Sequence, residues 1–183
     1  MAGPYSHHLP KEDRVAMIIR LPTLWTILLD CVAWAAFQTG VAYLATRWPR
    51  RLLNPRSWLL RTRSWEDGGS IYQRALRVRS WKELLPSGGS WFRGGFSMRK
   101  LEARDTEYLH KWVLESCRAE LCHWVAILPS ALFFLWNPPW VGLLMIAYAI
   151  TFNAPCIVAQ RYNRPRFQYI LSKQQAATGP TCH

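Results

Sequence analysis

Hydrophobic residues are concentrated in three long runs that carry almost no charge. The first run, 21–45, has Asp30 as its only charged residue, the second, 119–136, holds one acid in its first turn, and the third, 140–159, holds none. A helix needs about 20 residues to cross the hydrocarbon core of a bilayer. The pattern therefore predicts an α-helical integral membrane protein with about three transmembrane helices.

The second and third runs are separated only by Asn137-Pro138-Pro139, which has a tryptophan on each side. This arrangement predicts a transmembrane hairpin over 119–159, because tryptophan favours the membrane interface. An apolar helical pattern already begins at Asp105 and is expected to run into the second span without a break. For the first run, 21–45, a re-entrant or surface-lying helix is the alternative, since three basic residues precede it.

A basic segment, 47–118, lies between the first two runs and contains 16 Lys and Arg against seven acids. The tripeptide Arg-Ser-Trp begins at Arg56, Arg63 and Arg79. Arginine and tryptophan both find partners among lipid headgroups. We therefore expect an Arg/Trp-rich interfacial segment, with turns at three glycine pairs: Gly68-Gly69, Gly88-Gly89 and Gly94-Gly95.

The net charge of +12 is distributed unevenly along the chain, and this distribution predicts how the chain is oriented in the membrane. Most Lys and Arg lie in segment 47–118 and in a basic tail, 160–183, so both are expected in the cytoplasm, with the hairpin turn outside. This predicts one multi-pass domain over 1–183 in the cell membrane, with the bulk of its polar chain cytoplasmic. A nucleic-acid binder would also be basic, but three membrane runs argue against it.

Folding the hairpin about Pro138 places residue 138−k roughly level with residue 138+k, because both helices rise by about 1.5 Å per residue. His123 then meets Asn153, and Glu115 lies near Arg161. By the same count Arg118 lies level with the end of the third run. The polar side chains of both helices should therefore collect at the cytoplasmic interface, although the prolines within the helices will shift the register.

Glu120 and His123 are three residues apart and share a helix face. A carboxylate beside an imidazole can fix the tautomer of a histidine that acts as a general base. The alternative is that His123 and Trp124 anchor the chain at the interface while Glu120 forms a salt bridge with an arginine. A metal site is not expected, because carboxylate-bridged sites need a second Glu-x-x-His.

A second concentration of polar residues follows the third run. Three arginines among amide side chains suit a phosphate-bearing donor, which guanidinium groups bind in a bidentate manner. The alternative is a positive-inside stop signal. The candidates for binding the donor or an oxyanion are Gln160, Arg161, Asn163, Arg164 and Arg166, with Arg118 and Glu115 as supporting residues. Asp30 is a further candidate, since an acid within a span is costly unless it has a role.

Several of these motifs together resemble one family. The chain around Arg118-Ala119-Glu120-Leu121-Cys122-His123-Trp124, then Ile127-Leu128-Pro129, Asn153-Ala154-Pro155 and residues 160–166, closely resembles the glycosyl-4,4'-diaponeurosporenoate acyltransferase family, also called CrtO. Weaker similarity covers Trp81-Lys82, Leu85-Pro86 and Gly94-Gly95-Phe96. The first 46 residues match only as an apolar segment near the N-terminus.

The resemblance implies a membrane acyltransferase that esterifies a sugar hydroxyl of a glycosylated carotenoid with a fatty acyl group, the last step towards a staphyloxanthin-like pigment. Its implied partners are membrane lipids, the carotenoid acceptor and a fatty acyl donor, with acyl-CoA or an acyl-carrier thioester as co-substrate and no other cofactor. Nucleic acid is not expected. The alternative function is a non-catalytic membrane protein that binds anionic lipid or a partner through its Arg/Trp surface.

The resemblance brings no agreed catalytic residues, so the roles rest on the residues themselves. His123 is expected to take the proton of the acceptor hydroxyl while Glu120 or Asn153 orients its ring. The three arginines of 160–166 would hold the phosphate of the donor. Gln160 or Asn163 would donate to the oxyanion of the tetrahedral intermediate.

Overall fold

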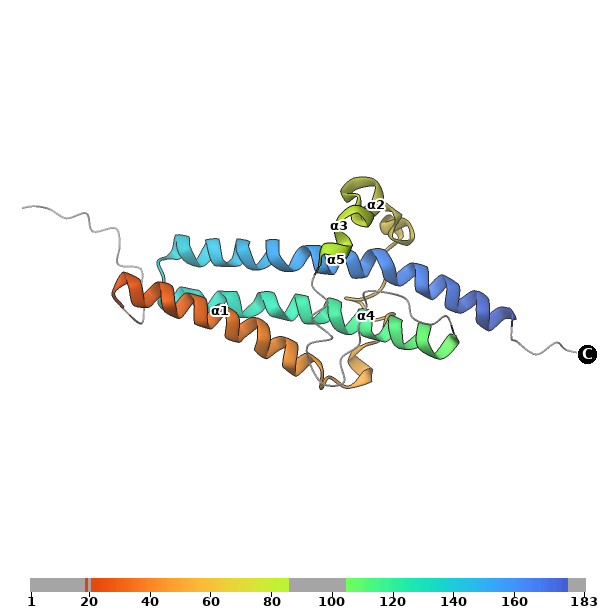
Figure 1. Cartoon of the computed structure of the whole chain (residues 1–183), viewed down its shortest axis with the longest axis horizontal. Coiled ribbons are helices and arrows are strands. Elements are labelled where there is room, and N and C mark those ends of the chain that lie inside the picture. Colours follow the sequence, from red (N-terminus) through yellow and green to blue (C-terminus); the bar gives the residue numbers. More distant parts are fainter. Residues whose placement is uncertain (1–18, 20, 86–104, 178–183) are drawn as a thin grey trace, which may run out of the picture.

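The computed structural model describes Ile19, residues 21–85 and residues 105–177, and all regular structure within these ranges is helical. Three long helices lie side by side, and two short ones lie against the middle of the last (Figure 1). The α-helices are α1 (Thr23–Ala45), α2 (Ser70–Leu76), α3 (Val78–Trp81), α4 (Thr106–Ile127) and α5 (Pro139–Ala177). The 3-10 turns are η2 (Arg50–Leu52), η3 (Ser64–Gly69), η4 (Lys82–Leu84) and η6 (Leu128–Leu135).

Helix α4 begins where its sequence supplies a cap. The side chain of Asp105 accepts a hydrogen bond from the backbone N–H of Tyr108 at 3.1 Å, which satisfies one of the free donors of the first turn. The predicted continuous helix from Asp105 into the second run is confirmed. Near its end the helix tightens into the 3-10 stretch η6, which begins one residue before Pro129, a residue that has no N–H for an α-helical bond.

The turn after η6 is short, and α5 begins at Pro139 as expected from the hairpin motif. Asn137 in this turn is buried, and Pro155 and Pro165 both lie inside α5. The apolar run ends at Ala159, but the helix continues to Ala177. The polar residues after 159 therefore belong to the same helix as the third run rather than to a separate tail.

Helix α1 packs antiparallel to α4. Asp30 accepts hydrogen bonds from Trp136 Nε1 at 2.7 Å and from Asn137 Nδ2 at 2.8 Å, at the hairpin turn. Further along, Gln38 Nε2 donates to the carbonyl of Ala126 at 3.3 Å. The beginning of α1 and the hairpin turn therefore share one end of the bundle, as the predicted topology requires, and the contact gives Asp30 a structural role.

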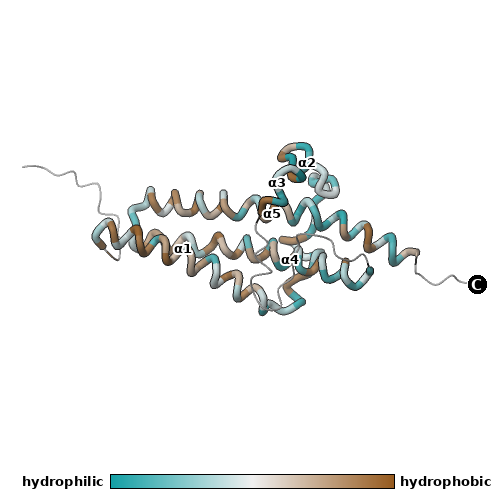
Figure 2. The backbone as a smooth tube through the Cα atoms, viewed as in Figure 1, coloured by the Kyte–Doolittle hydropathy of each residue, from teal (hydrophilic) through white to brown (hydrophobic). Residues whose placement is uncertain are grey.

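Three helical stretches in the described ranges are long and apolar enough to cross a membrane: Thr23–Ala45, Thr106–Leu135 and Pro139–Ala177. Few of their apolar residues are buried inside the protein, and in the first only 6% of the most hydrophobic window is buried. In Figure 2 hydrophobic positions predominate towards the hairpin turn, and hydrophilic positions towards the far end of α4 and α5. The apolar surface therefore faces outward, which is what a bilayer would cover.

The described part of the basic segment 47–118, the middle segment of the chain, packs against both helices of the hairpin. Leu53 and Leu60 bury their side chains against Cys117 of α4, whereas Tyr72 and Val78 pack on Tyr162 of α5. Glycine is required at one contact: Gly69 has φ +85°, and a Cβ there would lie 2.9 Å from the carbonyl oxygen of Arg161. The turn predicted at Gly68-Gly69 is confirmed, and the other two glycine pairs fall outside the described residues.

Candidate functional site

A buried ion-pair network lies between α4 and α5. Glu120 is fully buried and accepts a hydrogen bond from Arg161 Nε at 2.8 Å. Its other carboxylate oxygen accepts from Arg164 Nη2, and Arg164 is only 1% exposed. Trp124 Nε1 approaches the same carboxylate at 3.3 Å. Of the two interpretations of Glu120, the salt bridge with an arginine is therefore the one that the structure shows.

The network extends into the middle segment through Arg161. Its Nη1 donates to Glu66 Oε1 at 2.7 Å, and its Nη2 donates to the carbonyl of Leu59 at 2.6 Å. Two buried carboxylates are thus matched by the buried guanidinium group of Arg164 and the partly buried one of Arg161, and such pairing is the condition under which charges tolerate removal from water. One arginine consequently joins α4, α5 and the segment before α2.

Glu66 was not identified from the sequence. Its carboxylate accepts hydrogen bonds from the Tyr72 hydroxyl at 2.5 Å and from the backbone N–H of Arg63. Burial alone disfavours the charged form, but the bonds from Tyr72, Arg63 and Arg161 outweigh it and hold the pKa of Glu66 below its usual value. Burial, and the hydrogen bond to Glu66, raise the pKa of the Tyr72 hydroxyl. Glu66 is therefore a permanent negative charge at neutral pH.

His123 contacts Asn153, as the hairpin register predicted. His123 Nδ1 lies 2.8 Å from Asn153 Oδ1, and Asn153 Nδ2 donates to the carbonyl of Ala149 at 2.9 Å. Because the amide nitrogen is committed to Ala149, the oxygen faces the imidazole and accepts from it. Nδ1 therefore carries the proton, which leaves the lone pair of Nε2 available. A neutral imidazole in this tautomer is suited to act as a base.

Of the two residues expected to orient His123, Asn153 makes the contact. The carboxylate of Glu120 accepts from Arg161, Arg164 and Trp124 instead. Asn153 is fully buried, so its position is fixed by packing. The imidazole is thus held by a neutral amide, one turn along α4 from the ion-pair network.

The polar residues after the third run are mostly engaged within the protein. Arg161 and Arg164 face carboxylates of the chain itself, so a donor phosphate would have to displace Glu66 or Glu120 from them. Arg166 donates to the carbonyl of Tyr162, and its guanidinium lies 3.7 Å from the centre of the Tyr162 ring. This is the geometry of a structural network rather than of an open anion site.

Two amide side chains in this stretch have polar atoms without a hydrogen-bond partner in the described ranges. Asn163 Oδ1 accepts from Lys82 Nζ at 3.2 Å, which leaves its amide nitrogen as a donor. Gln160 Oε1 is buried and has no hydrogen-bond partner among the residues that the structure describes. Of the two predicted oxyanion donors, Asn163 therefore has a free N–H, whereas the unpaired atom of Gln160 is an acceptor; the buried Nε of Arg164 also has no partner in the described ranges.

Glu115 and Arg118 form a separate contact. Arg118 Nε donates to Glu115 at 3.0 Å, and its Nη1 donates to the carbonyls of Ala45 at 2.6 Å and Trp48 at 3.3 Å. The pair therefore fixes the end of α1 to α4. The expected proximity of Glu115 to Arg161 is not observed, since Glu115 pairs with Arg118 and Arg161 pairs with Glu120.

No group of three or more potential metal ligands occurs within residues 19, 21–85 and 105–177. The described site contains an imidazole, amides and an ion-pair network. A base held by a hydrogen bond, beside fixed charges and amide donors, is an arrangement that can deprotonate a hydroxyl and stabilise an anionic intermediate.

Comparisons with known proteins identify relatives of this chain. The family model described as glycosyl-4,4'-diaponeurosporenoate acyltransferase matches residues 55–173, which include Glu66 and the whole α4–α5 site. No solved structure matches the chain.

Curated relatives extend the similarity over most of the chain. A glycosyl-4,4'-diaponeurosporenoate acyltransferase of Staphylococcus haemolyticus (strain JCSC1435) is 27% identical over 164 residues, which are 87% of this chain and 95% of that protein. Proteins of the same name from Staphylococcus aureus strains bovine RF122 / ET3-1 and USA300 are each 33% identical over 138 residues, 75% of this chain and 83% of theirs. The chain is therefore an acyltransferase and belongs to the glycosyl-4,4'-diaponeurosporenoate acyltransferase family.

Proposed function

We propose that this protein transfers a fatty acyl group from a thioester donor to a sugar hydroxyl of a glycosylated carotenoid acid, the acylation that completes a staphyloxanthin-like pigment. The relatives named above carry this acceptor in their names. The observation that supports it most is the contact of His123 Nδ1 with Asn153 at 2.8 Å, because it leaves a basic nitrogen on a residue of the family-matched region.

In the proposed reaction His123 Nε2 takes the proton of the acceptor hydroxyl as its oxygen attacks the thioester carbonyl. The resulting tetrahedral intermediate carries a negative oxygen, to which the amide N–H of Gln160 or Asn163 donates. Collapse breaks the carbon–sulfur bond, and the departing thiolate receives the proton from His123. The products are the acyl ester and the free thiol of the donor, and the imidazole returns to its neutral state.

Asn153 acts on this reaction through His123. Its Oδ1 accepts a hydrogen bond from Nδ1–H, so the imidazole cannot rotate or adopt the other tautomer without losing this partly buried hydrogen bond. Glu120, Arg161 and Arg164 hold α4 and α5 at the spacing that the contact needs. We assign these three residues to the framework of the site.

We further propose that the three apolar helices span the cell membrane. Their outward apolar surfaces support this, and the excess of Lys and Arg in 47–118 and after 160 supports a cytoplasmic location for those parts. Both substrates carry long apolar chains, which would enter from the bilayer. A cytoplasmic face would give access to acyl-CoA or to an acyl-carrier thioester.

The test is to express the chain in a host that makes a glycosylated carotenoid acid and to analyse lipid extracts by mass spectrometry. The expected result is a new species heavier by one fatty acyl group, absent from the host with an empty vector. If the protein is present in the membrane fraction and the glycosylated acid stays unmodified, the proposed acceptor is wrong.

A further inference from the structure

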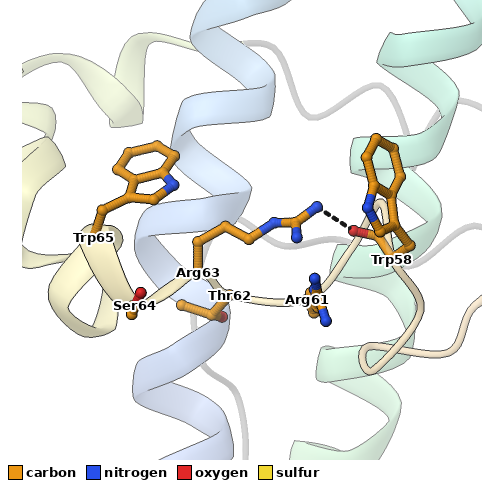
Figure 3. A pocket seen from close by; sticks show the side chains of 6 residues that line it. All are labelled: Trp58, Arg61, Thr62, Arg63, Ser64 and Trp65. Atoms are coloured by element: carbon orange, nitrogen blue, oxygen red, sulfur yellow. Dashed lines mark hydrogen bonds between the residues drawn. The ribbon is translucent and has the colours of Figure 1, made fainter.

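An open hollow lies along the segment from Trp58 to Trp65, which follows η2 and runs into the first residues of η3 (Figure 3). Its volume is about 610 Å³, within the usual range for small-molecule sites. It is lined by Trp58, Arg61, Thr62, Arg63, Ser64 and Trp65. The lining contains two cations, two hydroxyls and two aromatic rings, and no acid.

The two arginines of the hollow retain donors. Arg61 is exposed, and its side chain makes no hydrogen bond or ion pair with any residue in the described ranges. Arg63 uses one amino group to donate to the carbonyl of Trp58 at 2.6 Å, the contact drawn in Figure 3. A guanidinium has five N–H donors, so Arg63 keeps others. Two such forks beside the hydroxyls of Thr62 and Ser64 suit a phosphate group.

The aromatic rings of the hollow are unusually exposed. Trp58 is 73% and Trp65 is 61% exposed. The guanidinium of Arg63 lies 5.1 Å from the centre of the Trp58 ring, which helps to keep both groups in place. Large exposed rings beside cations are typical of surfaces that bind a ligand with an anionic end and an apolar or stacking body.

The hollow is fixed to the catalytic helices at both of its ends. Arg161 donates to Leu59, which precedes the lining residues 61–65, and to Glu66, which follows them. The same guanidinium also bonds Glu120 of α4. The position of the hollow is therefore set by the network that holds the site of His123.

We propose that this hollow binds a phosphate group carried by an amphipathic molecule, with Arg61 and Arg63 on the phosphate and the two tryptophans on its body. The molecule is either the phosphate-bearing acyl donor or an anionic membrane lipid. The first identity rests on the proposed function. A donor phosphate bound in the hollow lies away from Arg161 and Arg164, whose guanidinium groups bind Glu66 and Glu120.

The first arm of the test measures equilibrium binding of coenzyme A to the purified full-length protein in detergent at low salt. Arg61→Gln is the informative variant. The Arg61 side chain makes no hydrogen bond or ion pair within the described ranges, so its loss should not affect folding. Arg51→Gln is the control, since Arg51 is an exposed arginine on η2 outside the hollow. If the donor phosphate binds here, Arg61→Gln weakens binding by about tenfold, and Arg51→Gln leaves it within about twofold of the wild-type value.

The second arm measures lipid retention. The same three proteins are reconstituted in nanodiscs that contain phosphatidylglycerol, and the lipid that stays bound is quantified by native mass spectrometry. Selective loss in Arg61→Gln here, without selective loss of coenzyme A, identifies the ligand as an anionic lipid. If the wild-type protein binds neither probe, or if Arg51→Gln and Arg61→Gln lose binding equally, the proposal is overturned.

Acyl ester formation in the carotenoid-producing host tests the proposed function independently of ligand binding at the hollow. Selective binding at the hollow without any ester rejects the function and retains the binding site. Ester formation without selective binding of either probe rejects the hollow and retains the function.

Discussion

Arg161 donates its Nε–H to Glu120 across the α4–α5 interface at 2.8 Å. The same side chain binds Glu66 at 2.7 Å, so it is the only group of the described chain shown to bond both buried carboxylates. Removing one partner of a buried ion pair leaves an uncompensated charge and costs about 3–5 kcal/mol. Arg161 is therefore the residue on which the framework of the site depends.

We expect Arg161→Met to lower the free energy of unfolding by about 3–5 kcal/mol, because it leaves Glu66 and Glu120 with fewer donors. Thermal unfolding in detergent, followed by circular dichroism, measures the effect. Arg74→Met is the control, since its salt bridge with Asp67 joins exposed side chains and contributes less than about 1 kcal/mol. Equal effects of the two substitutions would show that the network does not stabilise the fold.

Glu66 predicts a dependence of stability on pH. Its pKa in the folded protein lies below the ordinary value of 4.5, so the unfolded chain binds more protons as the solution becomes acidic. The stabilisation is fully present above about pH 4.5 and is lost as the pH falls through the lower, folded pKa. The melting temperature of Glu66→Gln should be lower than that of the wild type at pH 7, and the difference should shrink towards pH 3. A constant difference over that range would contradict the assignment.

Gly69 provides a test of the contact between the middle segment and α5. We expect Gly69→Ala to destabilise the protein by about 1–3 kcal/mol, because φ is +85° and the added Cβ would meet the carbonyl oxygen of Arg161 at 2.9 Å. Gly40→Ala is the matched control. Gly40 lies inside α1 with nothing within 4 Å of an added Cβ, and alanine favours helices. The melting temperatures of both variants test this contact, and similar values for the two would show that Gly69 is not required there.

Asn153 is predicted to position His123 rather than to react. Asn153→Leu removes the acceptor of the Nδ1 proton and should lower the rate of acyl transfer by about 10- to 100-fold, whereas Asn153→Asp restores an acceptor and should recover most of it. The pH–rate profile is the discriminating measurement. It should move to higher pH in Asn153→Asp, because a carboxylate stabilises the imidazolium. An unchanged profile in both variants would mean that Asn153 has only a packing role.

The contact between His123 and Asn153 could be predicted from the sequence, because the two helices that carry them are joined by a short turn. Counting from Pro138 pairs His123 with Asn153, and the structure has that contact. The count does not predict that Arg161 meets Glu120 instead of Glu115. A guanidinium at the end of a long, flexible side chain can reach carboxylates on more than one turn of the neighbouring helix, so the level of its Cα does not fix its partner.

The role of Glu66 could not be predicted in this way. Glu66 and Asp67 are adjacent acids in a basic segment, and nothing local distinguishes them. One is buried against Arg161, and the other is exposed beside Arg74. The difference arises from the left-handed turn at 67–69, which places η3 on the backbone of α5. Long-range packing of this kind has no signature in the spacing of the residues.

The central claim is that His123 is the base of an acyl transfer. The most direct measurement is the amount of acylated pigment, by mass spectrometry, in carotenoid-producing cells that carry the wild-type chain or His123→Ala at equal membrane levels. Because a positioned general base contributes about 10²- to 10⁴-fold to a rate, we predict that His123→Ala yields less than about 1% of the ester made by the wild type. Ester formation at the wild-type level in His123→Ala would contradict the account.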